Sequence, residues 1–147
     1  MRNYQLYLIV NEFASHYFGR ERMFFQLFQE YEEAVGHFKY ILKEQIQFIT
    51  KPIQTLKIQQ VIVQNLQRNK TLHDHNGTYY IEIGSRSFAK LEIHERYIDI
   101  KSSGDYEAET IFFEVLRKIE SSFLAIDFEN YRCRWLKPIK ETKYVYE

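Results

Sequence analysis

The feature that most constrains the fold is a short, almost uninterrupted apolar run near the amino terminus, YQLYLIV at residues 4–10. A strand with one face in water alternates apolar and polar side chains, whereas a strand covered on both faces is apolar throughout. The run is far shorter than the roughly 18 to 20 residues of a membrane-spanning helix. It therefore predicts a strand in the middle of a sheet, with a packed layer on each side.

Three stretches after this strand repeat their apolar residues every three or four positions, as amphipathic helices do. The first begins after Asn11, a predicted N-cap, and extends to Gly36. Glycine disfavours a helix interior, so Gly19 is expected to divide this stretch into two helices. The second stretch covers residues 37–49 and the third residues 55–68. The third contains a β-branched run that lowers helix propensity.

The second half of the chain changes to the two-residue period of strands. One helix interrupts this pattern: acidic residues follow Asp105, and Arg117 and Lys118 stand near the predicted end, as the helix dipole favours. Asn130 tolerates the left-handed backbone of a tight turn and is expected to join the last two strands. The predicted strands are residues 79–83, 89–93, 98–100, 123–128 and 131–135.

This order of elements predicts an α/β protein of the α+β type. We expect two or three layers, with a mixed, mostly antiparallel sheet of about five to six strands packed with about three to four helices. A chain of 147 residues has the usual size of one domain. The sequence therefore predicts a single domain over residues 1–147, with a flexible tail at 139–147.

Charge balance and residue usage argue against several classes of protein. Twenty Lys and Arg residues balance twenty Asp and Glu residues, unlike a protein whose affinity rests on neutralising phosphates. The single cysteine cannot form an internal disulfide, and the amino terminus lacks an apolar segment followed by a cleavage site. We therefore expect a cytoplasmic protein that contacts neither a membrane nor nucleic acid directly.

Catalytic motifs are absent from the sequence, which has no G-x-S-x-G turn, no glycine-rich phosphate loop and no H-E-x-x-H helix. We expect neither catalysis nor a cofactor. The alternative is a small metal-dependent hydrolase that uses His73, His75 and His94, with Asp127, because imidazoles two residues apart on an extended segment can face one ion. A solvated polar loop before Gly77 explains the first two histidines without a metal.

The last predicted strand has two further features that bear on function. Neighbouring arginines lower the pKa of a thiol, but on a strand Cys133 shares its face with Tyr131 and Trp135, which predicts a buried, inert side chain. A third interpretation of the chain, direct nucleic-acid binding, rests on a basic strip beside aromatic residues. The strip consists of Arg132, Arg134, Lys137 and Lys140.

The aromatic cluster of the first predicted helix is harder to explain. Phe13 and Tyr17 are four residues apart and share a helical face, His16 lies beside them, and Phe18 points elsewhere. We expect one ring-bearing face to be exposed, as in the hot spots of protein interfaces, although burial of every ring in the core is the competing interpretation. On the second helix, Gln45 occupies a position of the apolar stripe where a hydrophobic residue is expected.

Four stretches of the sequence together resemble one known family. They are EFASHYFGRE at residues 12–21, KEQIQFITKP at 43–52, SGDYEAETIFFEVLRKI at 103–119 and WLKPIK at 135–140. They are similar to SirA, the family of sporulation inhibitors of replication found in endospore-forming bacteria. The resemblance spans both ends of the chain, whereas residues 55–100 contain no motif of the family.

This resemblance implies a small α/β protein that binds domain I, the amino-terminal domain of the replication initiator DnaA. Binding would repress the initiation of chromosome replication during sporulation. In the family, the binding surface includes a Phe and a Tyr of the first helix and a Gln of the next, which match Phe13, Tyr17 and Gln45 here. The two rings would enter an apolar groove, and the amide would fix the register because it both donates and accepts hydrogen bonds.

The resemblance extends to one residue near the carboxyl terminus. A proline that matches Pro138 is implicated in the function of the family, through the fold or near the surface rather than by contacting the partner. We further expect His16 and Arg20, one turn apart on the first predicted helix, to lie at the rim of the binding surface. The protein is expected to be a monomer before it binds.

Overall fold

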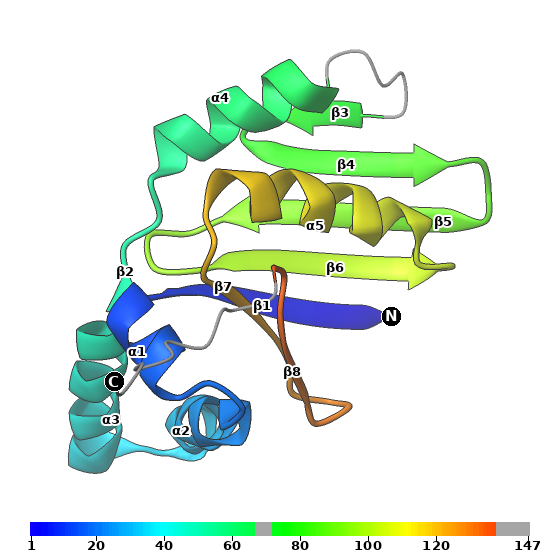
Figure 1. The fold of residues 1–147 in the computed structure, drawn as a ribbon. Coiled ribbons are helices and arrows are strands. Elements are labelled where there is room, and N and C mark those ends of the chain that lie inside the picture. The colour runs from blue at the N-terminus through cyan, green and yellow to red at the C-terminus, as the bar shows by residue number, and fades with distance from the viewer. Residues whose placement is uncertain (67–71, 138–147) are drawn as a thin grey trace, which may run out of the picture.

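The structure is a computed structural model that describes residues 1–66 and 72–137 of the chain (Figure 1). Its helices are α1 (Asn11–His16), α2 (Glu21–Glu33), α3 (Gly36–Ile49), α4 (Thr55–Leu66) and α5 (Glu107–Ile119). Its strands are β1 (Arg2–Ile9), β2 (Thr50–Lys51), β3 (Leu72–His75), β4 (Thr78–Ile83), β5 (Ser87–Ile93), β6 (Ile98–Gly104), β7 (Phe123–Asp127) and β8 (Arg132–Trp135). Pro138, the predicted tail at 139–147 and the predicted end of helix 55–68 lie outside the described residues.

All strands of the described residues belong to one antiparallel sheet. Its order is β3-β4-β5-β6-β1-β7-β8, and the short β2 pairs with the end of β1. β1 lies between β6 and β7, with Tyr4 opposite Ile100 and Leu6 opposite Ala125. The sequence prediction that the first apolar run forms a central strand is therefore confirmed.

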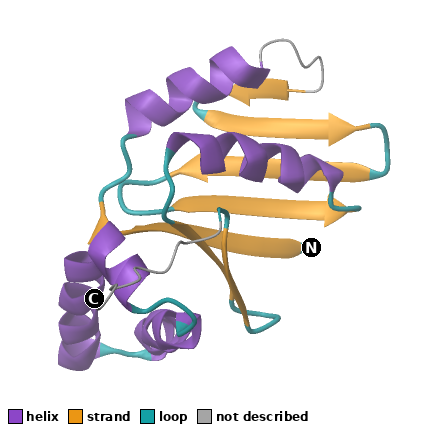
Figure 2. Ribbon diagram, viewed as in Figure 1, coloured by secondary structure: helices purple, strands orange, loops and turns teal. Residues whose placement is uncertain are grey.

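β1 is also covered on both faces, as its composition predicts. Leu6 and Leu8 pack in one buried cluster with residues of α4 and α5, whereas Tyr7 and Ile9 pack in a second with residues of α1, α2 and α3. Alternate residues of a strand point to opposite faces, so the two groups of helices lie on opposite sides of the sheet. Figure 2 shows α4 and α5 over the strands β3 to β6, with the other three helices gathered beyond β1.

The predicted break in the first helical stretch is confirmed. Gly19 has a φ of +79°, a left-handed conformation that suits glycine, and it lies between α1 and α2. The predicted cap is wrong, because Asn11 is the first residue of α1 and Val10 precedes it without a side-chain capping bond. His16 and Arg20 also do not share a helix: α1 ends at His16, and Arg20 stands directly before α2.

Two turns differ from the prediction for local reasons. Residues around His73 were expected in a loop, but β3 pairs with β4 through a two-residue turn at Asn76 and Gly77, both with positive φ. Asn-Gly is the sequence that favours such a hairpin turn. In the β7–β8 turn, Tyr131 rather than Asn130 adopts positive φ. Asn130 is held there by Asp127, whose carboxylate accepts hydrogen bonds from its backbone and its side chain.

The predicted fold class is confirmed, with more elements than expected. The described residues form eight strands and five helices. The additional strands include the two-residue β2 and the hairpin strand β3, whose polar sequence resembles a loop. No helix in the described part of the chain is both long and apolar enough to cross a membrane.

Candidate functional site

α1 is fixed at its start by the strand that precedes it and by the end of α3. The backbone N–H of Val10 donates to the carbonyl of Ile49 over 2.8 Å, and Ile9 of β1 pairs with Thr50 of β2. Ala14 turns into the core, where it is almost fully buried. These contacts hold the beginning of α1 beside the end of α3.

The predicted binding residues Phe13 and Tyr17 are partly buried, between the two alternatives that the sequence left open. Both rings pack against the cluster formed by α1, α2 and α3, yet each keeps part of its surface in solvent. The Tyr17 ring meets the edge of the Phe24 ring, with centroids 5.8 Å apart. The exposed His16 ring stands edge-on to Tyr17 at 4.9 Å. Each predicted ring is therefore held in place while one side stays accessible.

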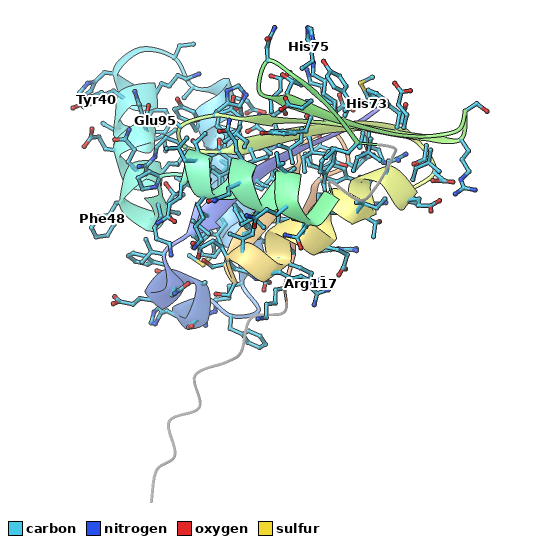
Figure 3. The ribbon with its side chains drawn as sticks, turned by 90° about the horizontal axis from the view of Figure 1, so that it is seen from above. Tyr40, Phe48, His73, His75, Glu95 and Arg117 are labelled. Carbon is cyan, nitrogen blue, oxygen red and sulfur yellow. The ribbon has the colours of Figure 1, made fainter. Side chains whose placement is uncertain are left out.

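Phe13 is linked to α3 through Phe48. Their ring centroids lie 5.4 Å apart with the planes inclined by 62°. Phe48 is 73% exposed, and its side chain projects outward from α3 (Figure 3). Because Gln45 is three residues before Phe48, the two side chains are neighbours on the surface of one helix. Phe13 and Gln45 therefore belong to one continuous region, joined by Phe48.

α3 carries two apolar stripes rather than one. The first, comprising Leu42, Ile46 and Ile49, faces the core. The second is exposed and consists of Phe38, Ile41, Gln45 and Phe48 at steps of three, four and three residues. Gln45 lies on an apolar stripe as predicted, but that stripe faces solvent. Solvent-exposed apolar patches of this kind mark interaction sites.

We call this region the α1–α3 surface. It consists of Phe13, His16, Tyr17, Phe38, Ile41, Gln45 and Phe48. Phe38, Ile41 and Phe48 were not among the binding residues expected from the sequence. The signal for a second face was nonetheless present, because the apolar residues of 38–49 cover more of a helix than one contact with a sheet can bury. Arg20 is exposed and stands directly before α2.

The three histidines of the alternative metal site are not brought together. His73 and His75 lie on the edge strand β3, whereas His94 follows β5, and β4 separates the two strands. His75 stands opposite Thr78, and Thr78 stands opposite Glu92, so the strands β3 and β5 are about 10 Å apart. Asp127 lies farther along the sheet, on β7. Among residues 1–66 and 72–137, no group of three potential ligands is placed to hold a metal ion.

The surroundings of Cys133 support the prediction of an inert thiol. It is partly rather than fully buried, on the face of β8 that carries Trp135. Burial raises the pKa of the Cys133 thiol to about 12, and the negative charge of Glu21 contributes further. Tyr131 was predicted to share this face with Cys133, but it lies in the preceding turn and is exposed.

The basic strip of the nucleic-acid interpretation is accompanied by acids. Arg132 and Arg134 are exposed on β8, and both line a pocket of about 460 Å³ between α5 and the sheet. Glu109 and Asp127, two buried carboxylates, line the same pocket. The arginines therefore do not form a purely positive surface. Lys140, the last member of the strip, lies outside the described residues.

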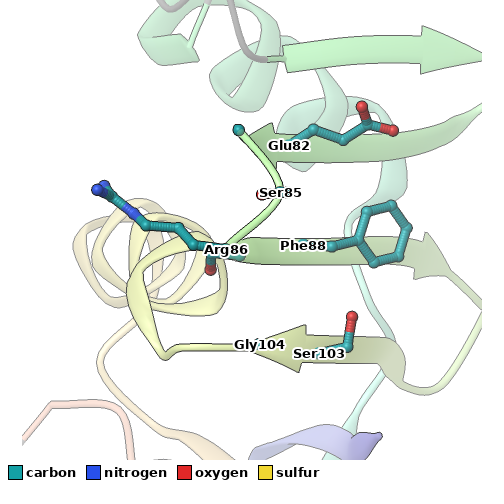
Figure 4. A pocket seen from close by; sticks show the side chains of 8 residues that line it. Glu82, Ser85, Arg86, Phe88, Ser103 and Gly104 are labelled. Atoms are coloured by element: carbon teal, nitrogen blue, oxygen red, sulfur yellow. The ribbon is translucent and has the colours of Figure 1, made fainter.

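A smaller pocket of about 130 Å³ lies at the β4–β5 turn (Figure 4). The Arg86 side chain points away from Glu82, Phe88 and Ser103 there. Its guanidinium pairs instead with Asp105 and Glu107 at the start of α5. This hollow thus lacks the convergent polar groups of a ligand site.

Residues 2–140 match the model of the family described as sporulation inhibitor of replication protein SirA. The chain belongs to the SirA family. It is also 47% identical over 150 residues to the sporulation inhibitor of replication protein SirA of Bacillus subtilis (strain 168), a match that covers 98% of this chain and 99% of the relative. The SirA match includes residues 55–100, where sequence reasoning found no motif of the family. The name of SirA describes an inhibitor of replication in sporulation.

Proposed function

We propose that this protein inhibits the initiation of chromosome replication during sporulation by binding domain I of DnaA through the α1–α3 surface. The name of the family and of the Bacillus subtilis relative supports the inhibitory role. The resemblance of Phe13, Tyr17 and Gln45 to the binding residues of the family supports the choice of partner. Such a function needs no chemical step, because occupation of the surface of DnaA is sufficient.

The observation that carries the proposal is the contact between Phe13 and the exposed Phe48. It joins α1 and α3 into one apolar surface with a polar amide, Gln45, on it. Aromatic side chains that are held in place before binding lose little conformational entropy, which favours affinity. The amide of Gln45 selects a partner that offers both a donor and an acceptor.

The test is a calorimetric titration of the purified protein with DnaA domain I. Phe13→Ala and Tyr17→Ala are each expected to weaken binding by about 2 kcal/mol or more, close to thirtyfold, as hot-spot truncations do. Gln45→Ala is expected to weaken it less. Leu56→Ala is the control, because Leu56 is an exposed hydrophobic residue of α4 on the other side of the sheet.

Thermal melts of the same variants separate docking from folding. Equal losses of binding and of stability would mean that the two rings act only as core residues. No binding by the wild-type protein would reject DnaA domain I as the partner. Binding to DNA with a strong salt dependence, or zinc in protein purified without a histidine tag, would favour the two competing functions.

Two further expectations follow from the proposed function. A protein that acts on the initiator of replication is cytoplasmic, where the chromosome lies. Its binding surface must be free before DnaA arrives, so we propose a monomer that forms a complex of one inhibitor with one domain I. Light scattering of each component and of their mixture measures both states.

A further inference from the structure

The turn that presents Tyr17 is connected to the last strand of the sheet. α1 has six residues, fewer than the roughly 12 to 15 that an isolated helix needs for marginal stability. After it, the Arg20 N–H donates to the carbonyl of Tyr17, and Gly19 takes a left-handed conformation. The position of the Tyr17 ring therefore depends on what holds this turn from outside.

A polar link runs from β8 to the turn. The indole Nε1–H of Trp135 donates to Glu21 Oε1 over 3.0 Å, although 114 positions separate the two residues. The same oxygen accepts the backbone N–H of Gly19 over 3.2 Å. One carboxylate oxygen thus ties the glycine of the turn to a strand at the edge of the sheet.

An aromatic link runs in parallel. The Trp135 ring meets the Phe24 ring edge-to-face with centroids 5.9 Å apart, and Phe24 meets Tyr17 in the same way at 5.8 Å. Trp135 is itself fixed by the pairing of β8 with β7, where it stands opposite Leu124. Trp135 of the sheet is therefore connected to the segment that carries Tyr17 in two ways, through the Glu21 carboxylate and through the Phe24 ring.

We propose that Trp135 and Glu21 are positioning residues for the α1–α3 surface. They fix the turn at Gly19, and through it Tyr17, without themselves touching the partner. This inference rests on the proposed function for its effect on binding, whereas its structural part concerns the free protein alone. It gives a role in docking to Trp135, which lies near the opposite end of the chain from α1.

Two substitutions separate positioning from general packing. Trp135→Phe keeps an aromatic ring against Phe24 but removes the indole N–H, and Glu21→Ala removes the acceptor. Each is expected to weaken binding of DnaA domain I about five- to tenfold, the range of one lost hydrogen bond. Glu21→Gln retains an acceptor oxygen and is expected to stay within about twofold of the wild type. The double variant is expected to be no weaker than either single variant, because both act through one link.

Hydrogen exchange in the free protein provides the readout that does not depend on DnaA. We expect the amide of Arg20 to exchange faster in Trp135→Phe and in Glu21→Ala, with the thermal midpoint close to that of the wild type. Unchanged exchange would overturn the inference, as would a loss of binding that merely follows a loss of global stability. If the wild type fails to bind DnaA domain I, the proposed function falls, while the exchange data still decide whether Trp135 holds the turn.

The sequence offers a spectroscopic signature of the same link, since Trp135 is the only tryptophan of the chain. Protein labelled with 5-fluorotryptophan gives one fluorine resonance from this site. We expect that resonance to move on addition of unlabelled DnaA domain I, and to move less in Glu21→Ala. If the protein binds domain I but the fluorine chemical shift does not change at saturating domain I, this would count against coupling between Trp135 and the α1–α3 surface.

Discussion

The Phe13 ring of α1 and the Phe48 ring of α3 lie 5.4 Å apart, although 35 positions separate the two residues in the chain. The contact is possible because β1 leads directly into α1 and pairs with β2 at the end of α3. Phe13 is partly covered by this arrangement, whereas Phe48 remains mostly in solvent. Phe48 therefore supports Phe13 on one side, while the rest of its ring stays exposed to solvent.

Phe48→Ala should weaken binding of DnaA domain I with little effect on folding. We expect a loss of about tenfold, because an aromatic contact is removed and the support of Phe13 is lost. The unfolding free energy should change by less than about 1 kcal/mol, since exposed side chains contribute little to the core. Tyr40→Ala is the matched control, because Tyr40 is an exposed ring on α3 outside the stripe (Figure 3).

A calorimetric titration and a denaturant melt of both variants check this prediction. Equal affinity of Phe48→Ala and wild type would remove the α3 stripe from the proposed surface. An equal loss in Tyr40→Ala would show that the whole helix responds to truncation and not the stripe.

The sequence predicted the helices and strands more accurately than it predicted which of their faces are buried. The continuous run at residues 4–10 predicts a doubly covered strand because no solvated face is left, and Gly19 predicts a break because helix interiors disfavour glycine. The periodicity of 37–49 also predicts a helix correctly. It does not say which apolar stripe faces the core, because this depends on what lies next to the helix in three dimensions.

The site itself was predictable only in part. Phe13, Tyr17 and Gln45 stood out from the sequence, but their connection through Phe48 required the β1–β2 pairing, which involves only two residues of β2. The link from Trp135 to Glu21 joins opposite ends of the chain and leaves no local pattern. Contacts of this kind depend on strand order, which periodicity does not determine.

Removal of Arg2 should destabilise the fold more than removal of a surface cation. Arg2 Nε donates to Glu109 Oε1 over 2.7 Å, and Glu109 is 1% exposed. Arg2→Ala therefore leaves a buried carboxylate without its cation, although the Ser102 hydroxyl still donates to it. We expect a loss of about 2–3 kcal/mol in unfolding free energy, below the full range for a broken buried pair because Arg2 is partly solvated. Arg86→Ala, which breaks exposed pairs, should cost about 0–1 kcal/mol.

Urea denaturation of the two variants measures the difference. A loss for Arg2→Ala no larger than that for Arg86→Ala would mean that solvent replaces the guanidinium at Glu109. The dependence of the unfolding free energy on urea concentration should be the same in both variants, since neither change alters the surface that unfolding exposes.

Cys133 should resist alkylation in the folded protein. Burial raises the pKa of its thiol to about 12, so little thiolate is present at pH 8. We expect reaction with iodoacetamide to be roughly a hundredfold or more slower than for the same chain unfolded in guanidinium, where the thiol has an ordinary pKa. Mass spectrometry of timed samples gives both rates, and similar rates would contradict the buried position of the sulfur.

The start of α5 should make stability depend on acid pH. The Glu107 backbone N–H donates to Asp105 Oδ1 over 3.0 Å, and this bond is the main cause that lowers the pKa of Asp105 below its ordinary value of 3.8. A carboxylate with a lowered pKa in the folded state stabilises the fold above its unfolded pKa, and this contribution disappears as the pH falls through the folded pKa. This loss of stability is therefore expected below about pH 4.

Asp105→Asn isolates this contribution, because asparagine still accepts the Glu107 hydrogen bond but carries no charge. The wild type should be the more stable protein at pH 6. The difference in unfolding free energy between the two proteins, the gap, should narrow and close as the pH falls below about 4. Urea melts at a series of pH values measure the gap. A difference that stays constant across the series would mean that the charge of Asp105 contributes nothing, and that any difference comes from the geometry of its hydrogen bond with Glu107.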